Sequence, residues 1–173
     1  MKIDKNVNYI FDFDGTIVDL KVDWTKLKEE INEKCILFDI DINKKLNIKI
    51  DSLKKKGIDI MEVLKKYEQP NDEVIYTIKE KTIAFIENLN EFYVVSNNLN
   101  STIKKVIDQL GFRQKCKMII AINDVEQSKP SNESFELLEQ YLINKKSLYI
   151  GDKETDKEFA QSCNIKFKYV DSI

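Results

Sequence analysis

The chain has 173 residues, with 28 lysine and arginine residues against 30 aspartate and glutamate residues, giving a formal net charge of −2. That length suits one domain with a core and a small insertion. The near-neutral charge provides no basic excess for binding nucleic acid or an anionic membrane. The sequence contains no histidine, which excludes Ser-His-Asp catalysis, Cys-His catalysis and zinc sites built on imidazole.

The cysteines and the N-terminus indicate a reducing compartment. Cys35, Cys116 and Cys163 are widely spaced and form no C-x-x-C pair. An odd number of cysteines without a secretory signal is typical of the cytoplasm. Residues 1–8 are polar and too short to act as a targeting segment, and no apolar run approaches the ~20 residues of a membrane span. We therefore expect a cytoplasmic monomer or homodimer without nucleic-acid or membrane partners.

Short, continuous apolar runs predict buried parallel strands, because neither face of such a strand meets water. Four runs are clear and a fifth, over 167–170, is weaker; the clear ones are 9–11, 92–95, 118–122 and 148–150. Helical patterns over 101–110, 132–142 and 155–163 separate most of them. Alternating strands and helices predict an α/β fold with a parallel sheet.

The segment between the first two strands breaks this alternation. Asp23 can cap one helix, with Leu27, Ile31 and Cys35 at helical spacing, and Asp59 can cap a second. A third helix is expected to begin near residue 70 and to run to about residue 89.

No convincing strand is expected between about 18 and 76, and a direct crossover between parallel strands needs far fewer residues. We therefore interpret 18–76 as a small all-helical cap inserted after the first strand. Residues 1–17 and 77–173 would form the α/β core. The sequence shows no internal repeat and no low-complexity linker.

Polar residues of a specific kind follow each of the four clear strands. The carboxyl ends of parallel strands meet at one edge of a sheet, where ligands bind. Acids placed there need a partner, because burying an unpaired charge is expensive. The sequence gathers acids, a hydroxyl, an amide and a lysine at this edge, namely Asp12, Asp14, Ser96, Asn97, Lys129, Asp152 and Asp156.

With these motifs the chain resembles the haloacid dehalogenase-like superfamily, in the branch related to phosphoglycolate phosphatase. Four family motifs occur in order: DFDGT from Asp12, SNN from Ser96, SKP from Ser128 and GDKETD from Gly151. The resemblance implies a Rossmann-like parallel sheet with helices on both faces. It also implies a small helical cap in the position of the insertion.

The resemblance further implies Mg²⁺-dependent hydrolysis of a small phosphorylated metabolite. Asp12 would be the nucleophile that forms an aspartyl-phosphate, and Asp14 would act as general acid and base. The carboxylates of Asp12 and Asp152 and the backbone carbonyl of Asp14 would hold Mg²⁺, which prefers oxygen ligands. Asp156 would support the metal either as a direct ligand or as a hydrogen-bond acceptor outside the set of direct ligands, and both roles stay open at this point.

The remaining motif residues would handle the transferring phosphoryl group. Thr16, Ser96 and the backbone N–H of Asn97 would bind its oxygens. Lys129 would offset the charge among the acids and contact the phosphoryl group. Taken alone, Lys129 could also be a surface lysine and Ser96 an ordinary helix N-cap.

Three other functions remain open from the sequence. A phosphomutase or other phosphotransferase would use the same site but needs a cap that excludes water, and a small cap with one arginine in the whole chain argues against it. A non-catalytic binding protein would be expected to have lost Asp12, Asp14 or Lys129. A phosphonate hydrolase would need a cap lysine for a Schiff base; the candidates are Lys21, Lys54, Lys55, Lys56, Lys65 and Lys66.

Overall fold

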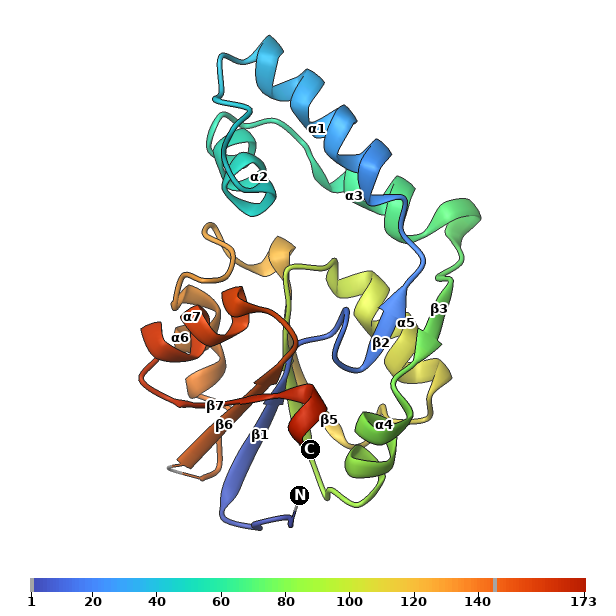
Figure 1. The fold of residues 1–173 in the computed structure, drawn as a ribbon, viewed down its shortest axis with the longest axis vertical. Coiled ribbons are helices and arrows are strands. Elements are labelled where there is room, and N and C mark those ends of the chain that lie inside the picture. Colours follow the sequence, from blue (N-terminus) through green and yellow to red (C-terminus); the bar gives the residue numbers. More distant parts are fainter. Residues whose placement is uncertain (1, 145) are drawn as a thin grey trace.

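The computed structural model describes residues 2–144 and 146–173. Its centre is a sheet of five parallel strands in the order β5-β4-β1-β6-β7 (Figure 1). The strands are β1 (Val7–Phe11), β4 (Phe92–Val95), β5 (Cys116–Ile120), β6 (Lys146–Gly151) and β7 (Lys166–Tyr169). The strands predicted from the apolar runs, including the weaker one near the C-terminus, are confirmed.

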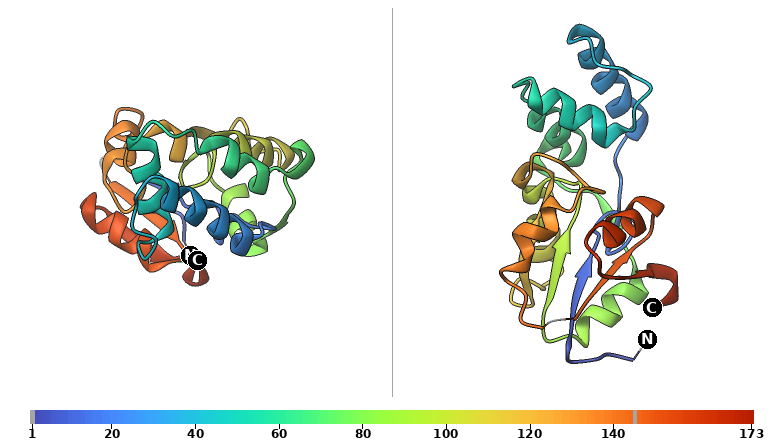
Figure 2. Two further views of the ribbon diagram at one scale, coloured as in Figure 1. Left: turned by 90° about the horizontal axis from the view of Figure 1, so that it is seen from above. Right: turned by 90° about the vertical axis from the view of Figure 1, so that its left-hand side faces the viewer.

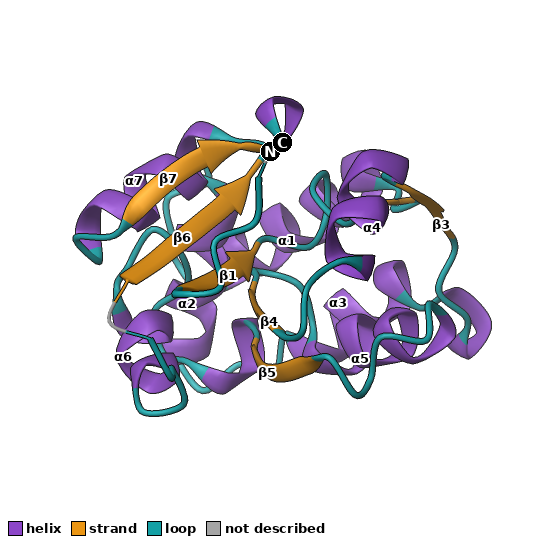
Figure 3. Ribbon diagram, turned by 90° about the horizontal axis from the view of Figure 1, so that it is seen from below, coloured by secondary structure: helices purple, strands orange, loops and turns teal. Residues whose placement is uncertain are grey.

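Helices cover both faces of this sheet, as Figure 3 shows from below. On one face lie α4 (Glu80–Glu87) and α5 (Asn100–Gln109), and on the other α6 (Glu133–Glu139) and α7 (Glu154–Ser162). The predicted Rossmann-like α/β fold is therefore confirmed. Within the described part of the chain, no helix combines the length and the apolar character that crossing a bilayer requires.

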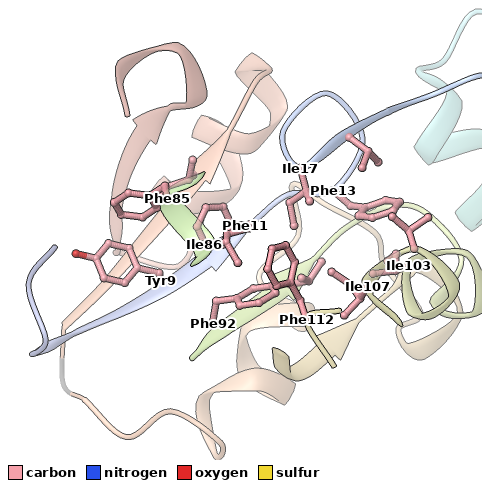
Figure 4. Close-up of a cluster of buried hydrophobic side chains, with 14 of the residues drawn as sticks. Tyr9, Phe11, Phe13, Ile17, Phe85, Ile86, Phe92, Ile103, Ile107 and Phe112 are labelled. Atoms are coloured by element: carbon pink, nitrogen blue, oxygen red, sulfur yellow. The ribbon is translucent and has the colours of Figure 1, made fainter. Parts of the chain in front are cut away.

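Side chains along each central strand alternate between two hydrophobic clusters, as the period of a strand dictates. Tyr9 and Phe11 of β1 belong to the cluster under α4 and α5, whereas Ile10 belongs to the cluster under α6 and α7. In the first cluster Phe11 lies between Phe85 and Phe92, with ring centroids 6.4 and 5.8 Å away (Figure 4). Burial on both faces explains the continuous apolar runs over 9–11, 92–95 and 148–150 of the central strands.

Three helices form a cap beyond the carboxyl ends of the strands: α1 (Trp24–Leu37), α2 (Leu46–Lys55) and α3 (Met61–Glu68) (Figure 2, right). Asp23 caps α1 as predicted, since its side chain accepts a hydrogen bond from the Lys26 N–H at 3.1 Å. The cap's apolar residues form a third cluster, which also takes in Leu99 and Ile122 from the core. The cap therefore packs on the strand ends.

Two expectations for the connecting segments are wrong. Strands β2 (Val18–Leu20) and β3 (Tyr76–Ile78) pair antiparallel at the two ends of the cap, where no strand was expected. The third expected helix, over 70–89, is instead a 3₁₀ turn (Pro70–Asp72), then β3, and only then α4. Helix α2 was not predicted. Strands of three residues are too short to produce a readable alternation.

Candidate active site

The carboxyl edge of the sheet faces the cap across a cavity of about 200 Å³. Strand β1 leads directly into Asp12, β4 into Ser96 and β6 into Asp152, so residues far apart in sequence meet here. Helices α1, α2 and α3 contribute the opposite wall. Most of the predicted site residues line the cavity: Asp12, Asp14, Ser96, Asn97, Lys129 and Asp156.

Lys129 is the centre of the charge network in this site. Its side chain is only 3% exposed, and its Nζ donates to Asp12 Oδ1 at 2.7 Å and to Asp156 Oδ1 at 2.6 Å. A lysine is almost never fully buried unless it is paired. Lys129 is therefore not an ordinary surface lysine, and it holds two buried carboxylates together.

Tyr149 completes the surroundings of that ammonium group. Lys129 Nζ donates to the Tyr149 hydroxyl at 2.6 Å, and the hydroxyl donates onward to the Val95 carbonyl at 2.7 Å. The ammonium group also lies 5.1 Å from the centroid of the tyrosine ring, within the range of a cation–π contact. Burial, with the nearby acids, raises the pKa of Tyr149 well above its ordinary value. The hydroxyl therefore stays neutral, and it adds no further negative charge.

The backbone of Lys129 is held from both the core and the cap. The Asn97 side chain accepts from the Lys129 N–H at 2.9 Å and donates to the Lys129 carbonyl at 3.1 Å. Asn47 of α2 donates to the same carbonyl at 2.8 Å. Asn97 thus positions Lys129 through its side chain, a contact that the sequence did not predict.

Further contacts tie helix α2 to the core. Asp51 accepts hydrogen bonds from the Ser128 N–H at 3.0 Å and the Ser128 hydroxyl at 2.8 Å. Lys54 Nζ donates to the Ile122 carbonyl at 3.0 Å and also to the Val125 carbonyl. The cap consequently rests on the loop that carries Lys129.

Strand β2 fixes the position of Asp14. The Leu20 N–H donates to Asp14 Oδ1 at 2.9 Å, and the Gly15 N–H donates to the Val18 carbonyl at 2.7 Å. Burial raises the pKa of Asp14, against the lowering effects of the Leu20 hydrogen bond and of Lys153. A carboxyl with a raised pKa keeps its proton more readily, as a general acid must.

Asp12 is buried and depends on cations for its negative charge. Burial and the neighbouring Asp156 raise the pKa of Asp12 to about 6, although Lys129 lowers it. Because the pKa of Asp12 remains raised, the single positive charge of Lys129 does not fully offset the cost of burying two carboxylates. An additional cation near Asp12 would favour the ionised form.

The acidic residues fit a divalent cation. One oxygen each from Asp12, Asp152 and Asp156 lies within 4.8 Å of the others. Asp152 Oδ1 is buried without a hydrogen-bond partner, and a hard cation would satisfy such an oxygen. A Cβ on Gly15 would come within 2.3 Å of Asp152 Oδ2, so glycine leaves room for this carboxylate.

Asp156 uses both of its oxygens within the protein. Oδ1 accepts from Lys129, while Oδ2 accepts from the backbone N–H groups of Asp152 at 3.2 Å and Lys153 at 3.1 Å. Gly151 permits this arrangement, because a Cβ there would lie 2.5 Å from Asp156 Oδ2. Asp156 thus orders the loop that presents Asp152.

Lys153 supplies a second positive charge near the acids and was not predicted. Its Nζ lies 3.3 Å from the Asp14 carbonyl oxygen and 3.8 Å from carboxylate oxygens of Asp14 and Asp152. The side chain is 57% exposed, so water screens these interactions. Its electrostatic contribution is consequently smaller than that of the buried Lys129.

Ser96 and Thr16 differ in their access to the cavity. Ser96 lines it, and its hydroxyl donates to Asn98 Oδ1 at 3.0 Å. Thr16 is fully buried, and its hydroxyl has no hydrogen-bond partner and does not line the cavity. The predicted role of Thr16 in binding substrate therefore stays a prediction.

Glu68, at the end of cap helix α3, is a buried acid that the sequence did not single out. It lines the cavity and accepts hydrogen bonds from the Asn98 side chain and from the Leu99 N–H, each at 3.1 Å. These contacts connect the cap to the loop that follows Ser96. Burial raises the pKa of Glu68 to about 7, although hydrogen bonds from Thr102, Leu99 and Asn98 lower it.

We expect the metal-free protein to lose stability as the pH rises, because the pKa of Glu68 is about 7 in the folded state and ordinarily 4.5. Between pH 4.5 and pH 7 the folded state binds more protons than the unfolded state. The free energy of unfolding that protonated Glu68 contributes below pH 4.5 is therefore lost as the pH rises through 7. The loss would reach about 3 kcal/mol. Urea unfolding at about pH 5 and about pH 8 measures it. Glu68→Gln should show a smaller loss, and an equal loss in both proteins would contradict this account.

The sequence matches the family model described as haloacid dehalogenase-like hydrolase over residues 9–170. No curated protein matches the chain significantly. A solved structure from Bacteroides fragilis, provisionally named a haloacid dehalogenase-like hydrolase, has a TM-score of 0.68 and 19% identity, covering 93% of this chain and 85% of that one.

Two further structures are similar in fold. A predicted phosphoglycolate phosphatase from Haemophilus somnus has a TM-score of 0.62 and 17% identity, covering 96% of this chain and 85% of that one. A Bacillus subtilis protein bound to magnesium is provisionally named a hydrolase of this superfamily. It has a TM-score of 0.54 and 17% identity, and the match covers 94% of this chain and 87% of that one. The family model spans nearly the whole chain, and the motif residues meet at one sheet edge. The protein therefore belongs to the haloacid dehalogenase-like hydrolase family and is an enzyme of that family.

Proposed function

We propose that this enzyme is a Mg²⁺-dependent phosphatase that hydrolyses a small phosphorylated metabolite through an aspartyl-phosphate on Asp12. The observation that carries the proposal is the buried Lys129, bonded to both Asp12 and Asp156 at the floor of the cavity. It keeps a carboxylate ionised in a buried place, where that carboxylate can act as a nucleophile. The predicted phosphoglycolate phosphatase among the structural neighbours supports phosphoryl chemistry for this fold.

The first half of the reaction uses both acids of the DFDGT motif. A carboxylate oxygen of Asp12 attacks the phosphorus, the bond from phosphorus to the ester oxygen breaks, and Asp14 gives its proton to that oxygen. In the second half, the Asp14 carboxylate takes a proton from water as the water oxygen attacks the phosphorus. The bond between phosphorus and Asp12 then breaks, releasing inorganic phosphate and restoring both acids.

The carboxylates of Asp12 and Asp152 and the backbone carbonyl of Asp14 would hold Mg²⁺. The cation would supply neutralisation of the negative charge on the phosphoryl oxygens. The unpartnered Asp152 oxygen supports this assignment, as does the magnesium bound to the Bacillus subtilis protein. We assign Asp156 a positioning role, because both of its oxygens already accept hydrogen bonds.

Thr16, Ser96, the backbone N–H of Asn97 and Lys129 would bind the phosphoryl oxygens. The Asn97 side chain would hold Lys129 in place for this task, given its paired hydrogen bonds to the Lys129 backbone. We propose that residues 18–76 act as a cap on the core formed by 1–17 and 77–173. We also propose that the enzyme works in the cytoplasm as a monomer or homodimer.

The cavity offers nothing that favours the alternative chemistries. Among the described residues, the lysines that line it are Lys129 and Lys153, both from the core, so none of the six cap lysines considered for a Schiff base reaches it. A phosphonate hydrolase of that kind therefore lacks its amine. Asp12, Asp14 and Lys129 are all present in the site, which argues against a binding protein without catalysis.

Phosphate release from a panel of small phosphorylated metabolites and an aryl phosphate tests the proposal. We expect release with Mg²⁺ and loss of release with a chelator. Product analysis with a sugar phosphate would separate hydrolysis from transfer to a second hydroxyl. A folded protein that binds Mg²⁺ but releases phosphate from no member of the panel would contradict the proposal.

Gly15→Ala should weaken Mg²⁺ binding and phosphate release by roughly 10- to 100-fold, because its Cβ would displace the Asp152 carboxylate. Gly111→Ala is the matched control. Gly111 also has a positive φ, +76° against +91° at Gly15, but nothing lies within 4 Å of its added Cβ. Titration calorimetry with Mg²⁺ and a phosphate-release assay compare the two variants. Equal losses in both would show that backbone strain, rather than the ligand position, causes the effect.

A further inference from the structure

The cap side of the cavity is mostly apolar. Above the acidic floor, side chains from all three cap helices and one core turn form the wall: Trp24, Leu27, Leu46, Ile50, Leu64 and Ile122. The space of about 200 Å³ lies below the roughly 300–1,000 Å³ of pockets for drug-sized ligands. With a phosphoryl group on the floor, a small leaving group would fill the space against this wall.

No positive charge on the cap side faces the cavity among the residues that the structure describes. The lysines that line it, Lys129 and Lys153, lie within 4 Å of the acids on the floor. The arginine of the chain, Arg113, is outside this lining and pairs with Asp108 at 3.6 Å.

Two lysines of α2, the helix that contributes Leu46 and Ile50 to the wall, have other partners. Lys54 Nζ donates to backbone carbonyls of the core turn, including that of Ile122 at 3.0 Å. Lys49 Nζ donates to the Asn32 side chain at 2.6 Å and to the Ile42 carbonyl at 3.3 Å. Neither lysine lines the cavity.

The polar groups that the cap does present to the cavity carry no positive charge. Asn47 is a neutral amide and donates a hydrogen bond to the Lys129 carbonyl. Glu68 is an acid, and the Asp14 carboxylate is close enough to raise the pKa of Glu68 further. A carboxylate or second phosphate on the leaving group that packs against this wall would lose hydration without gaining a cation from the cap, which is costly.

We propose that this site takes a small phosphate monoester whose leaving group is uncharged and rests against the apolar cap wall. Esters whose leaving group carries a carboxylate or a further phosphate would be poor substrates. The product would be inorganic phosphate and a small neutral alcohol. This inference rests on the proposed phosphatase function, and it concerns the leaving group alone.

Two isosteric pairs of esters test the charge of the leaving group at nearly constant size. One pair is 2-phosphoglycolate and its amide, and the other is 4-carboxyphenyl phosphate and 4-carbamoylphenyl phosphate. We expect kcat/KM to be roughly tenfold or more higher for the neutral member of each pair. Equal values, or a preference for the carboxylates, would overturn the proposal while leaving the phosphatase function intact.

A binding measurement separates this proposal from the catalytic one. Phosphonoacetate and its amide have a bond from carbon to phosphorus that the proposed reaction does not cleave. We expect calorimetry in the presence of Mg²⁺ to show tighter binding of the amide. Tighter binding of the amide without turnover of any ester would overturn the phosphatase function. It would still support the preference of the cavity for an uncharged group. Tighter binding of phosphonoacetate would overturn the proposal.

A positive charge placed in the wall should reduce or remove the preference for the neutral ester. Leu46 is half-buried at the start of α2 and lines the cavity, so Leu46→Lys would add a cation there. We expect the ratio of kcat/KM for the acid over the amide to rise roughly tenfold. Ile48→Lys is the matched control, because Ile48 lies on the same helix, is 42% exposed and does not line the cavity. An unchanged ratio in folded Leu46→Lys, or an equal change in both variants, would overturn the proposal.

Discussion

Asp12→Asn should reduce phosphate release by roughly 10⁴-fold or more, because the amide nitrogen and neutral oxygen that replace the carboxylate cannot attack phosphorus effectively. The substitution keeps the size of the side chain and one oxygen that can accept from Lys129, which donates to Asp12 Oδ1 at 2.7 Å. The fold should therefore persist. Single-turnover phosphate release with Mg²⁺ present measures the effect directly.

Asp124→Asn provides the control for this loss. Asp124 lies in the 3₁₀ turn after β5, accepts from the Ala121 N–H at 2.8 Å and does not line the cavity. It should keep nearly full activity. Retention of activity in Asp12→Asn, with the circular dichroism spectrum unchanged, would remove Asp12 from the role of nucleophile.

Lys129→Met should destabilise the protein and also remove most of its activity. The substitution deletes a cation that is bonded to Asp12 and Asp156, and both carboxylates are buried. Breaking such a buried pair by removing one partner costs about 3–5 kcal/mol. The pKa of Asp12, already raised to about 6 by burial and Asp156, should rise further and reduce the ionised nucleophile at neutral pH.

The matched control for Lys129→Met is Lys157→Met. Lys157 pairs with Glu154 at 3.0 Å, but the two side chains are 40% and 60% exposed. An exposed ion pair contributes little to stability, because water screens it, so the midpoint of urea unfolding of this variant should be close to that of the parent protein. Similar destabilisation in the two variants would contradict the view that the Lys129 network is a buried, paired cluster.

The sequence was sufficient to predict the sheet and the placement of the motifs on it. The parts of strands that are buried on both faces are apolar, and β4 has that pattern over its whole length, β1 over 9–11 and β6 over 148–150. Because the strands are parallel, their polar ends had to meet at one edge. The acids Asp12, Asp152 and Asp156 do meet there, within 4.8 Å of one another.

The elements that the sequence failed to predict depend on partners far away in the chain. Strand β2 has three residues and is defined by pairing with β3, which no local pattern reveals. Tyr149 is part of an apolar run, but its hydroxyl meets Lys129. Glu68 is one charged residue among many on the cap helices, and its burial depends on Leu99 in the core.

The most direct test of the central claim is covalent labelling of the enzyme during turnover. The enzyme would be mixed with an aryl phosphate carrying radioactive phosphorus, in the presence of Mg²⁺, and quenched with acid. We expect a labelled, base-sensitive acyl phosphate in the peptide that contains Asp12, and no label in Asp12→Asn. Rapid turnover with no labelled peptide, or with label on another residue, would contradict the proposed mechanism.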